Sequence, residues 1–440
     1  MFPLWPNRES QTIQLRYSIL MEKEPNTDQL PVRVHDREQL IYLLTEAAEI
    51  EHGLMCTYLY AGWSLKRSVD EQLTEAQLNA ITGWRREIKN VAMEEMMHLA
   101  MVNNLLMSIG APPHFRRQNF PVPPGYHPSS LVVRLAPLSR DTLQHFIYLE
   151  RPEGLPMDQA PGFESTLVYE RRSPRVLLTP TAEDFDTVGH LYRGIEEGFE
   201  QLAKQIGEQA LFAGDRDMQL GQDMLKLDGL FEVTDLASAQ KAINVIIEQG
   251  EGGRQDAQQS HYARFQAMAR EYDAFLAEDP AFVAHRPVAT DPVMLSPIDE
   301  SPLTHVMASD AARVLDAANA TYGLMLRLLA SATGVSRAGE PLRRIELDCA
   351  IRLMHAFDSL AVLLTTLPAD GGAQVNAGMN FHLPRSSLAL PQRNVGATLM
   401  AERANEIALA LASMENSGPK VPAKLAQNLR DVAARLMEGV

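Results

Sequence analysis

Cysteine and positive charge are both scarce in this sequence. Cys56 and Cys349 are its two cysteines in 440 residues, so no disulfide framework is readable and we expect a reducing, cytoplasmic location. Lys and Arg total 40 against 56 Asp and Glu, a formal charge of −16. A surface this acidic argues against nucleic acid or a membrane as a partner attracted by the general field of the protein.

Long apolar runs and glycine-rich phosphate loops are missing as well. No stretch of 18 apolar residues is present, which argues against a membrane span. Residues 1–10 lack the apolar segment of a signal peptide. The glycines of 250–253 follow a predicted helix, whereas a phosphate-cradling loop precedes one. These absences leave a globular protein without nucleotide-binding motifs.

Helical periodicity dominates the sequence and predicts an all-α protein. Hydrophobic residues make up 45% and charged residues 22%, which is ordinary globular usage. Asp36 with Gln39 three residues later is typical of a helix start, and Gly110 before two prolines is typical of a helix end. The predicted helices cover about 36–67, 74–109, 141–149, 181–212, 235–277 with a glycine break, 303–332, 340–367, 396–416 and 420–438.

Proline-rich stretches suggest how these helices are organised. We expect an irregular N-terminal segment at 1–33, a helical bundle at 34–276, a linker at 277–302 and a C-terminal helical unit at 303–440. The bundle carries a long insertion at 111–180, whose prolines forbid a long helix in its first part. Within it we expect a short strand at 131–135, and we expect the insertion to cover the bundle as a lid or pocket wall.

The sharpest chemical signal is the pair Glu95 and His98. Spacing i, i+3 places both side chains on one helix face. Glu-x-x-His alone usually marks a solvated face, but here the face is otherwise apolar, with Val91 and Val102 on the same stripe. Burying a carboxylate there costs several kcal/mol unless a partner compensates. A metal ion is one such partner.

Glu51 occupies a similar position on the preceding helix. It lies in the middle of an apolar stripe that includes Leu44, Leu54 and Tyr58, whereas Glu49 falls off the stripe. Two-metal sites in four-helix bundles take one Glu from each of two helices and a Glu-x-x-His from each of the other two. Half of that set is therefore present in the first two helices.

The predicted helices at 181–212 and 235–277, which would be the third and fourth long helices of the bundle, leave alternatives open. On the third, the apolar stripe favours Glu196, while His190 and Glu197 share another face that is more typical of solvent. On the fourth, Glu248 and Glu251 have the i, i+3 spacing, and His261 follows beyond the glycines. His261 returns to the site if the glycine-rich break bulges out and the helix resumes; a simple solvated break is the alternative.

The segments that carry these residues resemble a known family. Ala48–His52, Val91–His98 and Ile247–Gly252, together with His261–Phe265 and Gly378–Phe381, are similar to the ferritin-like family of iminophenyl-pyruvate dimer synthase domains. The resemblance implies a ferritin-like four-helix bundle with a metal centre and an oxidative role in natural-product biosynthesis. Glu51, Glu95 and His98 match the family pattern. His190 departs from it, because the family implies an acid there.

Together these features predict a non-haem metal-dependent oxidoreductase that acts on a small organic substrate with dioxygen or peroxide. Two iron ions are expected, with manganese as the alternative, because carboxylate and imidazole ligands suit both metals. The candidate ligands are Glu51, Glu95, His98, Glu196, His190, Glu248, Glu251 and His261. Oxidative coupling of amino-acid-derived imines is the alternative activity. A metal-free scaffold or partner-binding protein is the alternative class, and a homo-oligomer is compatible with either.

Overall fold

Helices form nearly all the regular structure in this computed structural model. It describes residues 32–122, 132–164, 178–183, 185–252, 259–295, 303–333, 340–372, 374–385, 393–415, 418–419 and 421–438. Val32–Val440 form one compact unit, and Met1–Pro31 are a separate unit outside the described residues. Two short strands, β1 (Pro292–Val293) and β2 (Thr304–His305), pair in parallel. The all-α prediction is confirmed.

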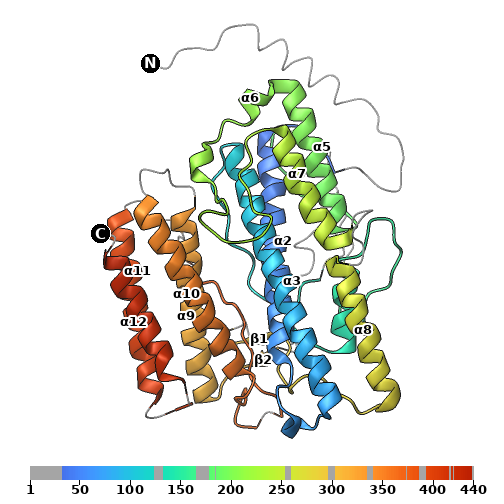
Figure 1. Ribbon diagram of the computed structural model, residues 1–440, viewed down its shortest axis with the longest axis vertical. Coiled ribbons are helices and arrows are strands. Elements are labelled where there is room, and N and C mark those ends of the chain that lie inside the picture. Colours follow the sequence, from blue (N-terminus) through green and yellow to red (C-terminus); the bar gives the residue numbers. More distant parts are fainter. Residues whose placement is uncertain are drawn as a thin grey trace. The chain divides into compact units, whose positions relative to one another are not determined.

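The first helix pair has the boundaries that its capping residues predict. Helix α2 (Arg37–Ser64) begins after Asp36, whose side chain accepts a hydrogen bond from the backbone N–H of Gln39. Helix α3 (Glu75–Ser108) begins with a capping box formed by Thr74 and Gln77, and the chain turns at Gly110 with φ of 86°. The two helices lie side by side over most of their length (Figure 1).

The second part of the bundle consists of shorter helices. Helix α5 (Val188–Ile206) leads through the single turn α6 (Glu208–Leu211) to α7 (Leu236–Ile247). Beyond α7 the chain widens into a π-helical turn, η3 (Glu248–Gly252), and α8 (His261–Glu278) follows. The predicted fourth helix is therefore two helices, and Figure 1 shows α8 beyond the end of α7. Such a π turn often marks a functional site.

In its described residues, 111–122, 132–164 and 178–180, the insertion contributes one helix to the bundle. Helix α4 (Arg140–Leu149) forms where the sequence predicts it and packs against α8. The predicted strand at 131–135 is wrong for residues 132–135, and residue 131 lies outside the described residues. The backbone of Leu135 instead pairs with Asp291, whose side chain accepts from the Leu135 N–H at 2.8 Å. The backbone N–H of Asp291 also donates to the carbonyl of Leu135 at 2.8 Å, so one residue replaces the ladder that a strand needs.

Four helices follow the proline-rich segment. Helix α9 (Ser309–Ala332) packs against α10 (Glu340–Leu364), and α11 (Arg393–Glu415) packs against α12 (Ala423–Glu438), as Figure 1 shows in orange and red. The indole N–H of Trp63 on α2 donates to Asp358 on α10 at 2.8 Å, which ties these helices to the bundle. None of the helices in the described residues is long and apolar enough to cross a membrane.

Candidate metal centre

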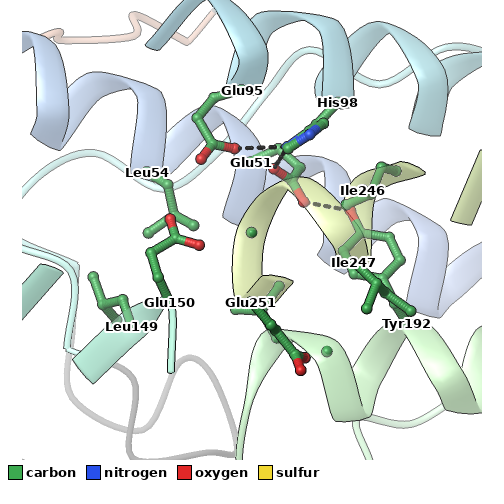
Figure 2. A pocket seen from close by; sticks show the side chains of 13 residues that line it. Glu51, Leu54, Glu95, His98, Leu149, Glu150, Tyr192, Ile246, Ile247 and Glu251 are labelled. Atoms are coloured by element: carbon green, nitrogen blue, oxygen red, sulfur yellow. Dashed lines mark hydrogen bonds and ion pairs between the residues drawn. The ribbon is translucent and has the colours of Figure 1, made fainter. Parts of the chain in front are cut away.

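Three of the predicted ligands meet between α2 and α3. Glu51, Glu95 and His98 are at most 2% exposed. Nδ1 of His98 lies 3.1 Å from Oε2 of Glu95 and 3.4 Å from Oε2 of Glu51, and Figure 2 shows the three side chains converging. Their donor atoms lie within 4.8 Å of one another. The helical stripes described above therefore do face each other.

A second cluster adjoins the first and shares Glu95 with it. Nδ1 of His261 lies 2.9 Å from Oε1 of Glu95 and 3.5 Å from Oε1 of Glu150. Glu150 caps the C-terminal end of α4, and His261 is the first residue of α8. Glu95, Glu150 and His261 again place one donor atom each within 4.8 Å. One carboxylate thus lies between two groups that can each hold a cation.

In both histidines a hydrogen-bond acceptor holds Nε2, the ring nitrogen that faces away from the cluster. Nε2 of His98 lies 2.8 Å from Oε1 of Gln249, and Nε2 of His261 lies 2.8 Å from Oε2 of Glu94. Since these oxygens only accept, each Nε2 carries a proton, and a ring that gives up its Nδ1 proton would present the Nδ1 lone pair to a cation held by the carboxylates. Metal-binding histidines are commonly held in this way. Nδ1 of His261 makes no hydrogen bond within the described residues, as expected of a ligand atom.

Two buried tyrosines hold the outer oxygens of the carboxylates. The hydroxyl of Tyr192 on α5 donates to Oε1 of Glu51 at 2.5 Å, and that of Tyr58 on α2 donates to Oε1 of Glu150. Burial raises the pKa of both hydroxyls well above the usual value, and the neighbouring carboxylates add to the effect. Both tyrosines therefore stay protonated and act as fixed donors.

The electrostatics of these side chains show how closely the groups are coupled. Burial, together with the charge of Glu95, raises the pKa of Glu51 to about 8. Against the effect of burial, hydrogen bonds to Glu51 and Glu95 raise the pKa of His98 to about 10. The charge of Glu95 similarly raises the pKa of His261, and that of His261 lowers the pKa of Glu95. Protons balance the buried carboxylates here, and a bound cation would replace them.

A small cavity of about 20 Å³ borders the first cluster. Leu54, Leu149, Val188, Ile246 and Ile247 give it apolar walls, and Glu251 and Gly250 contribute from the π turn. This volume accommodates about one water molecule. In this conformation the cavity is thus too small for an organic substrate.

Not all of the predicted residues enter the two clusters. Glu196 is half-buried one turn beyond Tyr192, and His190 accepts a hydrogen bond from the N–H of Asp186 at 3.4 Å. Glu248 is exposed. Glu251 lines the cavity, but its carboxylate points away from Glu95 (Figure 2). Among the described residues, the structure brings together Glu51, Glu95, His98 and His261.

Sequence reasoning missed Glu150 and the role of Tyr192. Tyr192 lies on the apolar stripe of the third helix that the sequence shows, one turn before the favoured Glu196. Glu150 directly follows the apolar run Phe146–Leu149, which was the available signal. Only the packing of α4 against α8 distinguishes Glu150 from an ordinary acid after a buried helix.

A family model described as ferritin-like matches residues 44–270. The chain belongs to the ferritin-like family. The ferritin-like resemblance stated from the sequence is thereby confirmed, and the matched region contains Glu51, Glu95, His98, Glu150 and His261.

Two characterised relatives cover most of this chain. It is 28% identical to dichlorochromopyrrolate synthase of Lentzea aerocolonigenes and 27% identical to 2-imino-3-(indol-3-yl)propanoate dimerase of Chromobacterium violaceum. The alignments take in 92% and 88% of this chain, but only 41% and 38% of the relatives. The chain thus spans about two fifths of their length.

A solved structure of a ferritin-like protein from Caulobacter vibrioides is also similar. It is 18% identical with a TM-score of 0.41, covering 68% of this chain and 87% of that protein.

Proposed function

We propose that this protein is a two-metal oxidoreductase that couples two molecules of a small α-imino acid. The observation that carries the proposal is the position of Glu95 between two histidines, each of which turns Nδ1 toward it. Two adjacent groups of buried acids and imidazoles around one shared carboxylate suit a pair of metal ions. Similarity to a dimerase of an imino acid supports this class of substrate.

We assign the ligands of each ion from the positions of the donor atoms. Glu51, Glu95 and His98 would hold one ion, and Glu95, Glu150 and His261 the other. Oxygen and imidazole donors without thiolate suit iron or manganese. Such a pair, when bound, supplies the redox capacity to oxidise an organic substrate with dioxygen or peroxide. Two observations support the fit of these residues to metal ions. Nδ1 of His261 makes no hydrogen bond within the described residues, and an acceptor holds Nε2 of each imidazole.

In the overall reaction that we propose, the oxidant accepts the electrons and protons that the substrates lose. Joining two imino acids through a new C–C bond removes one hydrogen atom from each, two electrons and two protons in total. One molecule of hydrogen peroxide accepts them and becomes two molecules of water. Dioxygen as the acceptor becomes hydrogen peroxide instead.

The residues of the chain itself keep the centre fixed and dry. Tyr192 and Tyr58 each hold one carboxylate oxygen, which orients Glu51 and Glu150. Gln249 and Glu94 hold the two imidazoles, and the apolar cavity wall excludes bulk water. Fixed ligands with open positions and a dry cavity are what the protein contributes to metal-dependent oxidation.

The proposal is tested by metal content and by product. Protein purified under iron-replete conditions is analysed for iron and manganese, and then incubated with indole-3-pyruvate, ammonium and either dioxygen or peroxide. We expect about two metal ions per chain and a product with the mass of a coupled dimer, both absent in Glu95→Ala and His98→Ala. A folded protein without metal under these conditions supports a scaffold role instead and contradicts the proposal.

A further inference from the structure

Arg193 carries a guanidinium that contacts Glu251, one of the residues that line the cavity. It lies on α5, its side chain is 40% exposed, and Nη2 donates to Oε2 of Glu251 at 3.2 Å. Nη1 donates to Glu153, which belongs to the segment after α4. Glu251 itself lines the cavity next to the first cluster. Arg193 is therefore separated from the cavity by one acidic side chain.

Glu251 is poorly satisfied in this position. The residue is 8% exposed, and its Oε1 makes no hydrogen bond within the described part of the chain. Oε2 has two donors, Arg193 and the backbone N–H of Glu153 at 3.3 Å. A buried carboxylate oxygen without a donor is unfavourable. This energy favours any change that moves Glu251 out.

The local backbone allows Glu251 to occupy this position and to leave it. Gly189 on α5 faces Oε1, and a Cβ built there would lie 1.1 Å from that oxygen. Glu251 lies on the π turn η3 between Gly250 and Gly252, and glycines tolerate a wider range of backbone angles than other residues. In Figure 2 its carboxylate points toward the α5 ribbon and away from Glu95 and His98.

We propose that Arg193 binds the carboxylate of the substrate, and that Glu251 is an internal carboxylate which this group displaces. The inference rests on the proposed function, because an α-imino acid carries a carboxylate next to its reactive carbon. Guanidinium groups favour carboxylates through paired, charge-assisted hydrogen bonds. When Glu251 moves away, the cavity loses one of its walls on the Arg193 side, so substrate binding and opening of the cavity are coupled.

Two indole ligands that differ in one group test the carboxylate. Indole-3-propionate carries a carboxylate and indole-3-propionamide a neutral amide of the same shape. Their dissociation constants for the metal-loaded protein are measured by isothermal titration calorimetry. We expect the acid to bind at least about ten-fold more tightly than the amide, a preference that corresponds to about 1.4 kcal/mol.

Variants test whether Arg193 causes the preference for the acid over the amide. Arg193→Gln is expected to bring the ratio of the two dissociation constants close to one, and Arg193→Lys to restore part of it. Arg140→Gln, which removes a pair with Asp273 on the surface, is the matched control and keeps the ratio. Glu251→Gln removes the competing charge and is expected to bind the acid about three- to ten-fold more tightly than the unaltered protein does.

These binding measurements test the roles of Arg193 and Glu251 separately from the proposed function. A wild-type protein without preference for the acid, a preference that survives in Arg193→Gln, or a Glu251→Gln variant that binds the acid no more tightly overturns it. Glu251→Gln keeps the test decisive even where Arg193→Gln fails to fold. Metal content and dimer formation are measured on the same preparations, so metal-loaded, coupling-competent Arg193→Gln with unchanged preference refutes this inference alone.

Discussion

Oε1 of Glu95 lies 2.9 Å from Nδ1 of His261, at the point where α3 meets the start of α8. The other oxygen of the same carboxylate lies 3.1 Å from Nδ1 of His98, one helical turn along α3. A buried carboxylate that contacts two imidazoles is stable only while positive charge is shared around it. Glu95 is therefore the residue on which both halves of the candidate centre depend.

Replacing Glu95 should remove both metal ions at once. Glu95→Gln keeps the size of the side chain but removes the shared ligand, so we expect metal affinity to fall by more than about 100-fold at both positions. Glu94→Gln is the neighbouring control. It alters the acceptor behind His261 and removes an ion pair with Arg264, but it changes no proposed ligand, and partners of this kind contribute about 10–100-fold to metal affinity. Metal content after dialysis against graded chelator distinguishes the two, and a Glu95→Gln protein that retains one ion contradicts the shared-ligand assignment.

The hydroxyl of Tyr192 should matter for metal affinity beyond its effect on folding. Tyr192→Phe removes a buried hydrogen bond to Glu51, and hydrogen bonds to charged groups contribute about 1.5–3 kcal/mol. Tyr60→Phe is the control, because the Tyr60 hydroxyl is equally buried but donates to the backbone carbonyl of Ala289. Both variants are expected to lower the free energy of unfolding in urea. Only Tyr192→Phe should also weaken metal binding, by about 10-fold or more; equal metal affinity in both would argue against this role.

The sequence predicted the first half of the site better than the second for a physical reason. Glu51, Glu95 and His98 lie on long regular helices, where spacing alone determines which side chains share a face. The start of α2 at Asp36 was readable in the same way, from a local capping interaction. Local periodicity is thus enough to predict site residues that lie on neighbouring, uninterrupted helices.

The second half depends on contacts between distant segments. His261 comes to the centre as the first residue of α8, after the chain has left the α-helix at the π turn Glu248–Gly252, and the sequence left that route open beside a solvated break. Glu150 comes from the insertion at 111–180, where short helices have weak signals. The stripe on α5 was read as favouring Glu196, yet the side chain that reaches Glu51 is the tyrosine one turn earlier. Periodicity identifies a face, but not which residue on that face reaches the partner.

Gly189 should accept a methyl group only by displacing Glu251. In Gly189→Ala the new Cβ would lie 1.1 Å from Oε1 of Glu251, the far end of a flexible side chain whose Oε1 has no donor within the described residues, so we expect a loss of only about 1 kcal/mol, the lower end of the usual cost of overpacking. Gly83→Ala on α3 is the matched control, since nothing lies within 4 Å of the position that its new methyl group would take. There alanine should stabilise the helix by about 0.5–1 kcal/mol. Thermal unfolding of the two variants measures the difference, and a loss of about 3 kcal/mol in Gly189→Ala would show that Glu251 is held firmly in place.

His145 should make the fold sensitive to mild acid. The residue is fully buried on α4, with Nδ1 donating to Oε1 of Gln159 at 3.1 Å and its ring stacked on Phe163. Burial lowers the pKa of His145 from 6.5 to about 4, and the charge of Arg134 contributes to the decrease. Arg134 is itself paired with Asp291. The folded state therefore favours the neutral imidazole.

The direction of the pH effect follows from proton uptake. Between pH 6.5 and 4 the unfolded chain binds a proton at His145 that the folded chain does not, so stability is complete above pH 6.5 and falls as the pH approaches 4. At about 1.4 kcal/mol per pKa unit the loss reaches about 3 kcal/mol. His145→Gln cannot take up this proton, and other titrating groups cancel when the two proteins are compared. Urea unfolding at pH 7.5 and 4.5 should show His145→Gln gaining stability relative to the unaltered protein at the lower pH; a difference independent of pH would mean that the imidazole is protonated in the folded state.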